Sequence, residues 1–311
     1  MTTWGLTATI LAPTPDILRF AAYHLDQGAH RLYLYLDADT PDAYAALKAH
    51  PKVRVQTCDA AHWKRLMGRR PDKHQARQTL NATHAYVRKA EVDWLIHMDV
   101  DEFLVPEDSV ARTLSSVPAT TTSARVRPME QLGGASDAFK AFIPSDGSRQ
   151  ARVAALYPTF GKHLKGGFVS HVAGKLFVRT GLDDITVKIH NAFQGDQMLA
   201  GAAEPGDLSL AHCHAKTWDA WRAAYGYRLD KGSYRSELKP ATRPDKGGMT
   251  LHDLFRWLEA EQGEAGLRAF YDEVIGDSAD MRARLSAQGL LRRVDLDLDA
   301  SLRRHFPDAA V

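Results

Sequence analysis

Cysteine is scarce in this sequence, which has only Cys58 and Cys213 among its 311 residues. Two cysteines so far apart cannot provide a disulfide framework, so we expect reduced thiols. Long hydrophobic runs are missing as well, because eighteen apolar residues never follow one another, which argues against a transmembrane helix. The first residues lack the basic start of a signal peptide. These absences predict a cytoplasmic protein without a transmembrane segment.

The chain also carries little net charge, because its 40 lysines and arginines nearly balance 38 aspartates and glutamates. A net charge of +2 creates no global field that would attract nucleic acid, so we expect no nucleic-acid partner. Hydrophobic residues make up 44% and charged residues 25%, which is ordinary for a soluble enzyme and excludes wholesale disorder. Local basic patches leave peripheral contact with a membrane open.

Strand and helix patterns alternate in the first part of the chain. Residues 7–12 predict a strand, residues 16–25 a helix that stops at Gly28, and residues 31–36 a second strand. A strand, a helix and a strand within about thirty residues form a right-handed βαβ unit and imply a parallel sheet. The sequence therefore predicts the α/β class.

The last part of the chain has a helical pattern. Amphipathic segments occupy residues 251–261, 266–274 and 279–287. We therefore predict one α/β domain over residues 1–245, with a helical extension over residues 246–311 packed on it.

An apolar run that ends in carboxylates organises the sequence. Residues 94–96 predict a short buried strand, and Asp99 and Asp101 follow at its carboxyl end. Side chains of an extended segment alternate with a period of two, which places both carboxylates on one side. In open α/β sheets, ligands bind outside the carboxyl ends of the strands, and divalent cations that bridge phosphates take one or two carboxylates. The spacing therefore predicts a divalent cation at Asp99 and Asp101.

The same D-x-D spacing occurs in two other places, so context has to separate the three. One follows the strand predicted at residues 31–36, and another, at residues 295–299, alternates with leucines. A solvated strand or a helix-capping face explains the latter set. For residues 99–101 the alternative is a strand end that turns in solvent, with Asp101 capping a short helix.

Residues 94–104 resemble the W-(I/L/V)-x-x-x-D-x-D-E-F-(L/I) stretch of a branch of glycosyltransferase family 2, whose members have the GT-A fold. The resemblance implies a GT-A-type, Rossmann-like sheet that is mostly parallel and flanked by helices. It also implies a hexosyltransferase-type enzyme that moves a sugar from a nucleoside diphosphate sugar, with UDP as the expected nucleotide, to a saccharide or other hydroxyl acceptor. Mn²⁺ or Mg²⁺ would be the cofactor, the reaction would be inverting, and polysaccharide or glycoconjugate synthesis would be its setting.

Further segments follow the order of that family. Residues 23–28 match its Y-H-x-x-x-G pattern, and residues 37–42 are similar to its D-x-x-S-x-D pattern. The resemblance implies that Asp37 or Asp39 accepts hydrogen bonds from the base or the ribose of the nucleotide. It places Gln78 at a polar position near the nucleotide-sugar.

The second half of the chain adds basic and imidazole candidates. Relatives carry K-x-x-x-R where this chain has Lys175 and Arg179, so both become candidates for contacts to phosphates, with ion pairing inside the protein as the alternative. The stretch that begins at His212 is similar to the family's H-Y-x-x-K-S. The resemblance makes His212 a third metal ligand and places Lys216 near the diphosphate. Cys213 stands where the family has tyrosine.

The groups that would move protons are less defined. Asp101 holds the cation in this interpretation, and the neighbouring Glu102 either orients that site or takes part in catalysis. An inverting enzyme needs a general base within about 3 Å of the acceptor hydroxyl. Asp137, His163 and His171 lie in the expected region of the sequence, and no motif chooses among them.

Two other functions compete with this interpretation. A sugar-1-phosphate nucleotidyltransferase would need a glycine-rich loop with a basic residue after the first strand, where residues 12–15 read Ala-Pro-Thr-Pro. A non-catalytic carbohydrate- or partner-binding protein could keep the fold, but the candidate metal ligands argue against it. The basic segment at residues 64–77 is either a solvated face or a clamp for phosphates or acidic sugars.

Overall fold

The computed structural model describes residues 1–88, 91–199, 203–243, 245 and 247–309. The contacts divide the chain into two compact units. Unit 1 comprises residues 1–127, 173–210 and 296–311, and unit 2 comprises residues 128–172 and 211–295. The predicted boundary at residue 245 lies inside unit 2, and the end of the chain returns to unit 1.

Unit 1 is built on four parallel strands. They are β1 (Trp4–Ile10), β2 (Arg31–Leu36), β3 (Val53–Thr57) and β4 (Trp94–His97), in the order β4-β1-β2-β3. Nearly every residue of β1, β2 and β4 is buried, as expected for strands that are covered on both faces. The predicted class, α/β with a parallel central sheet flanked by helices, is confirmed.

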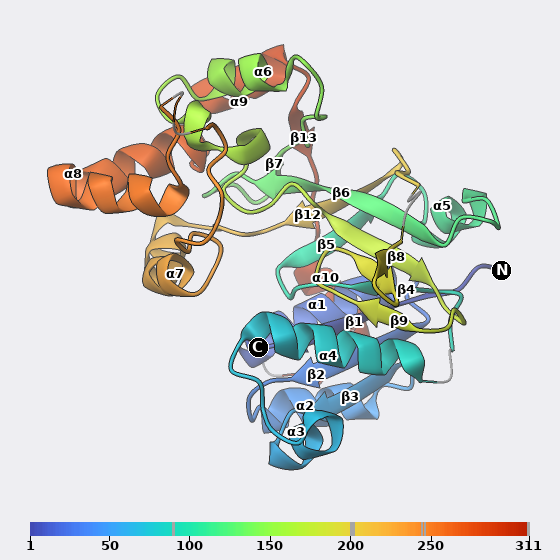
Figure 1. The fold of residues 1–311 in the computed structure, drawn as a ribbon. Helices are drawn as coiled ribbons and strands as arrows, with labels where there is room; N and C mark the ends of the chain where they lie inside the picture. Colours follow the sequence, from blue (N-terminus) through green and yellow to red (C-terminus); the bar gives the residue numbers. More distant parts are fainter. Residues whose placement is uncertain (89–90, 200–202, 244, 246, 310–311) are drawn as a thin grey trace. The chain divides into compact units, whose positions relative to one another are not determined.

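Helices cover both faces of these parallel strands. The connecting helices are α1 (Thr14–Asp26), α2 (Pro41–Ala49), α3 (Ala60–Met67) and α4 (His74–Val87). The strand order runs one way from β1 to β3 and then reverses to β4, so right-handed crossovers place α1 and α2 on one face and α4 on the other. Figure 1 shows α4 across the strands β1 and β2.

Antiparallel strands and a last helix complete unit 1. The strand β8 (Lys175–Arg179) pairs antiparallel with β4, and the first half of β6 (Ser123–Gln131) pairs with β8. The remaining elements are β5 (Glu102–Pro106), α5 (Val110–Ser116), β9 (Ile185–Val187), β10 (Ala192–Gln194), β11 (Gln197–Met198), the start of β12 (Leu208–His212), and α10 (Leu298–His305). Asp297 accepts a hydrogen bond from the backbone of Ala300 at the start of α10. The helix-capping explanation of this acidic set is therefore confirmed.

Unit 2 joins short strands to a helical layer. The second half of β6 pairs with β7 (Ala138–Lys140), which pairs with β13 (Leu291–Arg293). The helical elements are α6 (Arg149–Leu156), η1 (Gly161–His163), η2 (Lys165–Gly167), α7 (Trp218–Asp230), α8 (Leu251–Val274) and α9 (Ala279–Ala287). The two helices predicted at residues 251–261 and 266–274 are confirmed as the two parts of α8, which a kink at Gly263 separates; the φ of Gly263, 62°, is left-handed.

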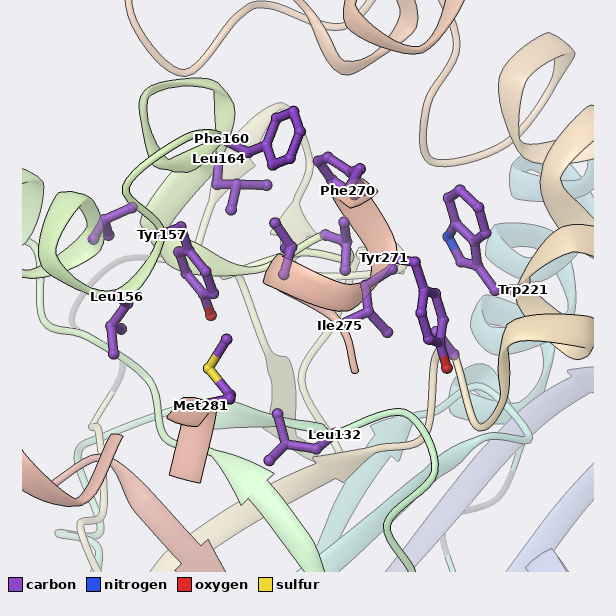
Figure 2. Close-up of a cluster of buried hydrophobic side chains, with 14 of the residues drawn as sticks. Leu132, Leu156, Tyr157, Phe160, Leu164, Trp221, Phe270, Tyr271, Ile275 and Met281 are labelled. Atoms are coloured by element: carbon purple, nitrogen blue, oxygen red, sulfur yellow. The ribbon is translucent and has the colours of Figure 1, made fainter. Parts of the chain in front are cut away.

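The core of unit 2 draws side chains from both of its sequence segments. Trp221 of α7 packs edge-on against Phe255 of α8, with ring centroids 5.8 Å apart. Phe270 of the same helix packs against Phe160 at 5.1 Å. Figure 2 shows Leu132, Tyr157 and Met281 in the same buried cluster. The C-terminal helices are therefore part of a core shared with residues from the middle of the chain.

Tyr23 and His24, which open the Y-H-x-x-x-G segment, tie α1 to β5. The Tyr23 hydroxyl donates to the Leu104 carbonyl at 2.8 Å, and the Leu104 N–H donates to His24 Nε2 at 3.4 Å. His24 Nδ1 lies 2.8 Å from the Phe20 carbonyl, so the ring makes both contacts in the neutral form. Burial lowers the pKa of His24 to about 4.

Stability should therefore fall as the pH drops from 6.5 to 4. Over this range the unfolded chain binds a proton at His24 and the folded protein does not, which costs about 1.4 kcal/mol per pH unit and about 3 kcal/mol over the window. Urea unfolding at pH 7, 6 and 5 measures how the free energy of unfolding changes with pH. In His24→Gln this slope should be smaller by the contribution of one proton, about 1.4 kcal/mol per pH unit. A control variant that removes no titrating group should keep the wild-type slope. An unchanged slope in His24→Gln would refute this account.

Candidate functional site

The acidic stretch lies where the sequence placed it, directly after β4. A reciprocal pair of hydrogen bonds closes its turn: the Asp99 N–H donates to Glu102 Oε2 at 2.8 Å, and the Glu102 N–H donates to the Asp99 carbonyl at 3.1 Å. The strand β5 begins at Glu102, so Asp101 caps no helix and that alternative is wrong. Asp101 is half-buried in the turn, at the edge of the sheet where the parallel strands end.

The Asp99 carboxylate is held by two protein donors. Gln78 Nε2 donates to Oδ1, and Lys175 Nζ lies 2.6 Å from Oδ2. The same ammonium is 3.1 Å from Glu102 Oε2. The side chains of Lys175 and Glu102 have no exposed surface. Lys175 therefore lies between two carboxylates, and the predicted contact of this lysine to a phosphate does not fit its burial.

Charge pairing keeps this group ionised. Burial alone would raise the pKa of Asp99, but Lys175 brings that pKa well below its usual range. Burial likewise works against the charge of Lys175, but Asp99 and Glu102 raise the pKa of the ammonium. His97, just before the turn, is buried, and burial lowers its pKa to about 4. Neither ring nitrogen of His97 has a hydrogen-bond partner among the residues that the structure describes.

Asp37 and Asp39 lie in different environments. The Asp37 carboxylate has no exposed surface and accepts from Arg77 Nε at 2.7 Å and Arg70 Nη2 at 3.0 Å. Arg77 also donates to the Pro71 carbonyl at 2.9 Å, so this group fixes the segment before α4. Asp39 is exposed. Of the two predicted nucleotide contacts, Asp39 is the one that a ligand reaches without breaking an ion pair.

Arg179 does not lie near Asp99. The antiparallel pairing of β8 and β4 puts Arg179 opposite Trp94, at the amino end of β4, and Lys175 toward the Asp99 end. The Arg179 guanidinium is 4.2 Å from the centre of the Trp94 ring and donates to the Thr121 carbonyl at 2.8 Å. Four residues of strand span about 13 Å, so Lys175 and Arg179 cannot grip one diphosphate, and the predicted contact of Arg179 does not fit.

Two of the imidazole candidates, His171 and His212, lie together in unit 2. The ring of His212 is 5.2 Å from the ring of His171 and 5.2 Å from that of His214. His214 Nε2 is 3.1 Å from the Tyr234 hydroxyl. The sequence interpretation did not include His214 among the ligands; this residue lies two positions after His212, in the turn that follows β12. Lys216, which follows, is exposed.

The other candidate for a general base, Asp137, also lies in unit 2. Its carboxylate pairs with Arg293, and Arg282 lies 3.9 Å away. The identity of the base stays a prediction among Asp137, His163 and His171.

In the described part of the chain, no helix combines the length and apolar character that crossing a membrane requires.

Comparison with known proteins gives a family match over part of the chain. Residues 13–125, all in unit 1, match the family described as glycosyltransferase family 92. Among solved structures, HddC from Yersinia pseudotuberculosis is similar at 12% identity and a TM-score of 0.38, over 73% of this chain and 99% of HddC. An active-site mutant of LgtC is similar at 10% identity and a TM-score of 0.28, over 56% of this chain and 57% of LgtC. No curated protein matches the chain.

Proposed function

We propose that this chain, a glycosyltransferase by the match of residues 13–125 to family 92, moves a sugar from a UDP-linked donor to a hydroxyl acceptor with inversion. The matching family is number 92 rather than the predicted family 2, and the predicted enzyme class is confirmed. Polysaccharide or glycoconjugate synthesis is the proposed setting. The cytoplasmic location and a peripheral membrane contact stay predictions.

One observation carries the proposal. The turn that holds Asp99 and Asp101 lies at the carboxyl edge of four parallel strands, inside the stretch that matches the family. Ligands of open α/β sheets bind at this edge. Asp39 follows β2 of the same sheet, and its carboxylate is exposed. This position suits a contact to the nucleotide.

The residues present fit a hard divalent cation. Asp101 offers carboxylate oxygens from a partly exposed turn, and carboxylates are the ligands that Mn²⁺ and Mg²⁺ take in phosphate sites. When bound, the cation supplies Lewis-acid stabilisation of the departing diphosphate. Asp101 would hold it, and Asp99 and His212 are the other predicted ligands. Asp39 would orient the nucleotide, and the general base would take the proton of the acceptor hydroxyl.

A thermal-shift screen of nucleoside diphosphates and their sugars, with and without Mn²⁺, tests this proposal. UDP at about 100 times its Kd should stabilise the protein by about 2.7 kcal/mol, which raises Tm by several degrees. The shift should need the cation and should be larger for UDP than for GDP or ADP. If no nucleoside diphosphate changes Tm with or without Mn²⁺, the proposed donor class is wrong.

A further inference from the structure

The contacts of Asp99 differ from those that a metal ligand needs. Both carboxylate oxygens accept hydrogen bonds, one from Gln78 and one from the buried ammonium of Lys175. Each oxygen could accept a second contact, so these hydrogen bonds alone do not exclude a metal. Charge repulsion disfavours it, because a divalent cation on the same carboxylate would lie close to a fully buried ammonium that cannot move into solvent.

Lys175 also explains how the turn tolerates so many acidic groups. Asp99, Asp101 and Glu102 carry three negative charges within four residues, and Lys175 returns one positive charge. The net of two negative charges is the amount that one divalent cation balances. Lys175 also gives the buried carboxylate of Glu102 a countercharge, and removing the charged partner of a buried carboxylate is strongly destabilising.

The same contacts set the shape of the turn. Glu102 Oε2 receives the Asp99 N–H and also lies against the Lys175 ammonium, so one oxygen links the start of the turn to β8. Asp101 lies between Asp99 and Glu102, the residue at which β5 begins. A turn fixed at Asp99 and at Glu102 presents the carboxylate of Asp101 in a defined direction.

We infer that Lys175 is a permanent internal cation, which makes Asp99 and Lys175 positioning residues and leaves Asp101 as the carboxylate of this turn that binds the metal. The inference rests on the proposed function, since it assigns roles inside the proposed cation site. It changes the predicted ligand set, because Asp99 no longer belongs to it. The sequence pattern could not separate the two aspartates, because it treated residues 99–101 as extended, whereas the structure has a turn there.

Mn²⁺ titration followed by electron paramagnetic resonance tests the inference on the full chain. Asp99→Asn keeps the Lys175 and Glu102 pair and an amide that can face both Gln78 and Lys175, so the Mn²⁺ affinity should stay within about 3-fold of the wild type. Asp101→Asn should weaken it by at least about 30-fold. Equal losses in the two variants would overturn the inference. A wild-type chain that binds no Mn²⁺ would instead refute the proposed function.

Removing the positive charge of Lys175 should change Mn²⁺ affinity, which would not be expected if this lysine only supported the fold. Lys175→Met frees the Asp99 carboxylate and makes the turn more negative, so a folded variant should bind Mn²⁺ more tightly while kcat falls. Weaker Mn²⁺ binding by a folded variant would contradict the inference. If the variants do not fold, crystals of the wild type soaked with Mn²⁺ decide: an Asp99 oxygen about 2.2 Å from the ion would overturn it, and an intact Asp99 and Lys175 pair would support it.

Discussion

Asp101→Asn is expected to lower kcat/KM for sugar transfer by about 10³-fold or more while Tm changes by only a few degrees. The amide cannot supply the negative charge that holds a divalent cation, and Lewis-acid stabilisation of the leaving diphosphate is worth several kcal/mol. About 4 kcal/mol corresponds to a 10³-fold change in rate. Asp101 is half-buried, and the turn around it is held by Asp99, Glu102 and Lys175, so the fold should survive.

The measurement is release of UDP from a panel of UDP-sugars at saturating Mn²⁺, with Tm measured on the same samples. Asp108→Asn is a matched control, because Asp108 is an exposed acid of the same unit that pairs only weakly, at the surface, with Arg112. The control should keep the wild-type rate. If Asp101→Asn retains more than about a tenth of the activity with an unchanged response to Mn²⁺, the metal does not depend on this carboxylate.

Local patterns predicted the parallel half of unit 1 because each strand there is short, apolar and separated by a helix with clear signals. The strand predicted at residues 31–36 has the observed bounds of β2. The same patterns gave no warning that β8 would pair antiparallel with β4. Pairing direction is decided by contacts between distant segments, which a local period does not contain.

The site divides in the same way. Position along the chain was enough to put Asp99 and Asp101 at the edge of the sheet, because residues that follow a parallel strand emerge there. It did not show that Asp37 pairs with Arg70 and Arg77. The basic segment therefore has a partly structural purpose, and the binding candidate beside it is the exposed Asp39. Which acid meets which base is a property of the folded chain.

The second large effect is expected in unit 2, where Lys140→Met should destabilise the protein by about 3–5 kcal/mol. Lys140 Nζ lies 2.6 Å from Glu130 Oε2, and both side chains are only 2% exposed. Ser170 donates to the other oxygen of Glu130 from its backbone and its hydroxyl, and Lys140 also donates to the Val274 carbonyl at 3.0 Å. Without Lys140 the buried charge of Glu130 loses its ion-pair partner.

Urea unfolding at pH 7 measures this loss, and Lys165→Met, at an exposed lysine of the same unit, should change stability by less than about 0.5 kcal/mol. The double variant Lys140→Met with Glu130→Gln should regain most of the stability, because it removes the uncompensated charge as well. A double variant no more stable than Lys140→Met would show that packing around Lys140, and not charge, explains the loss.

The pH dependence separates charge from packing once more. Burial alone would raise the pKa of Glu130, but Lys140 lowers it to about 2. In the wild type Glu130 therefore contributes stability above its unfolded pKa near 4.5, and this contribution disappears as the pH falls toward 2. In Lys140→Met the pKa of Glu130 should rise instead, so protonation relieves the buried charge. The difference in unfolding free energy between the two proteins should therefore shrink between pH 7 and pH 4, whereas a packing defect would leave it constant.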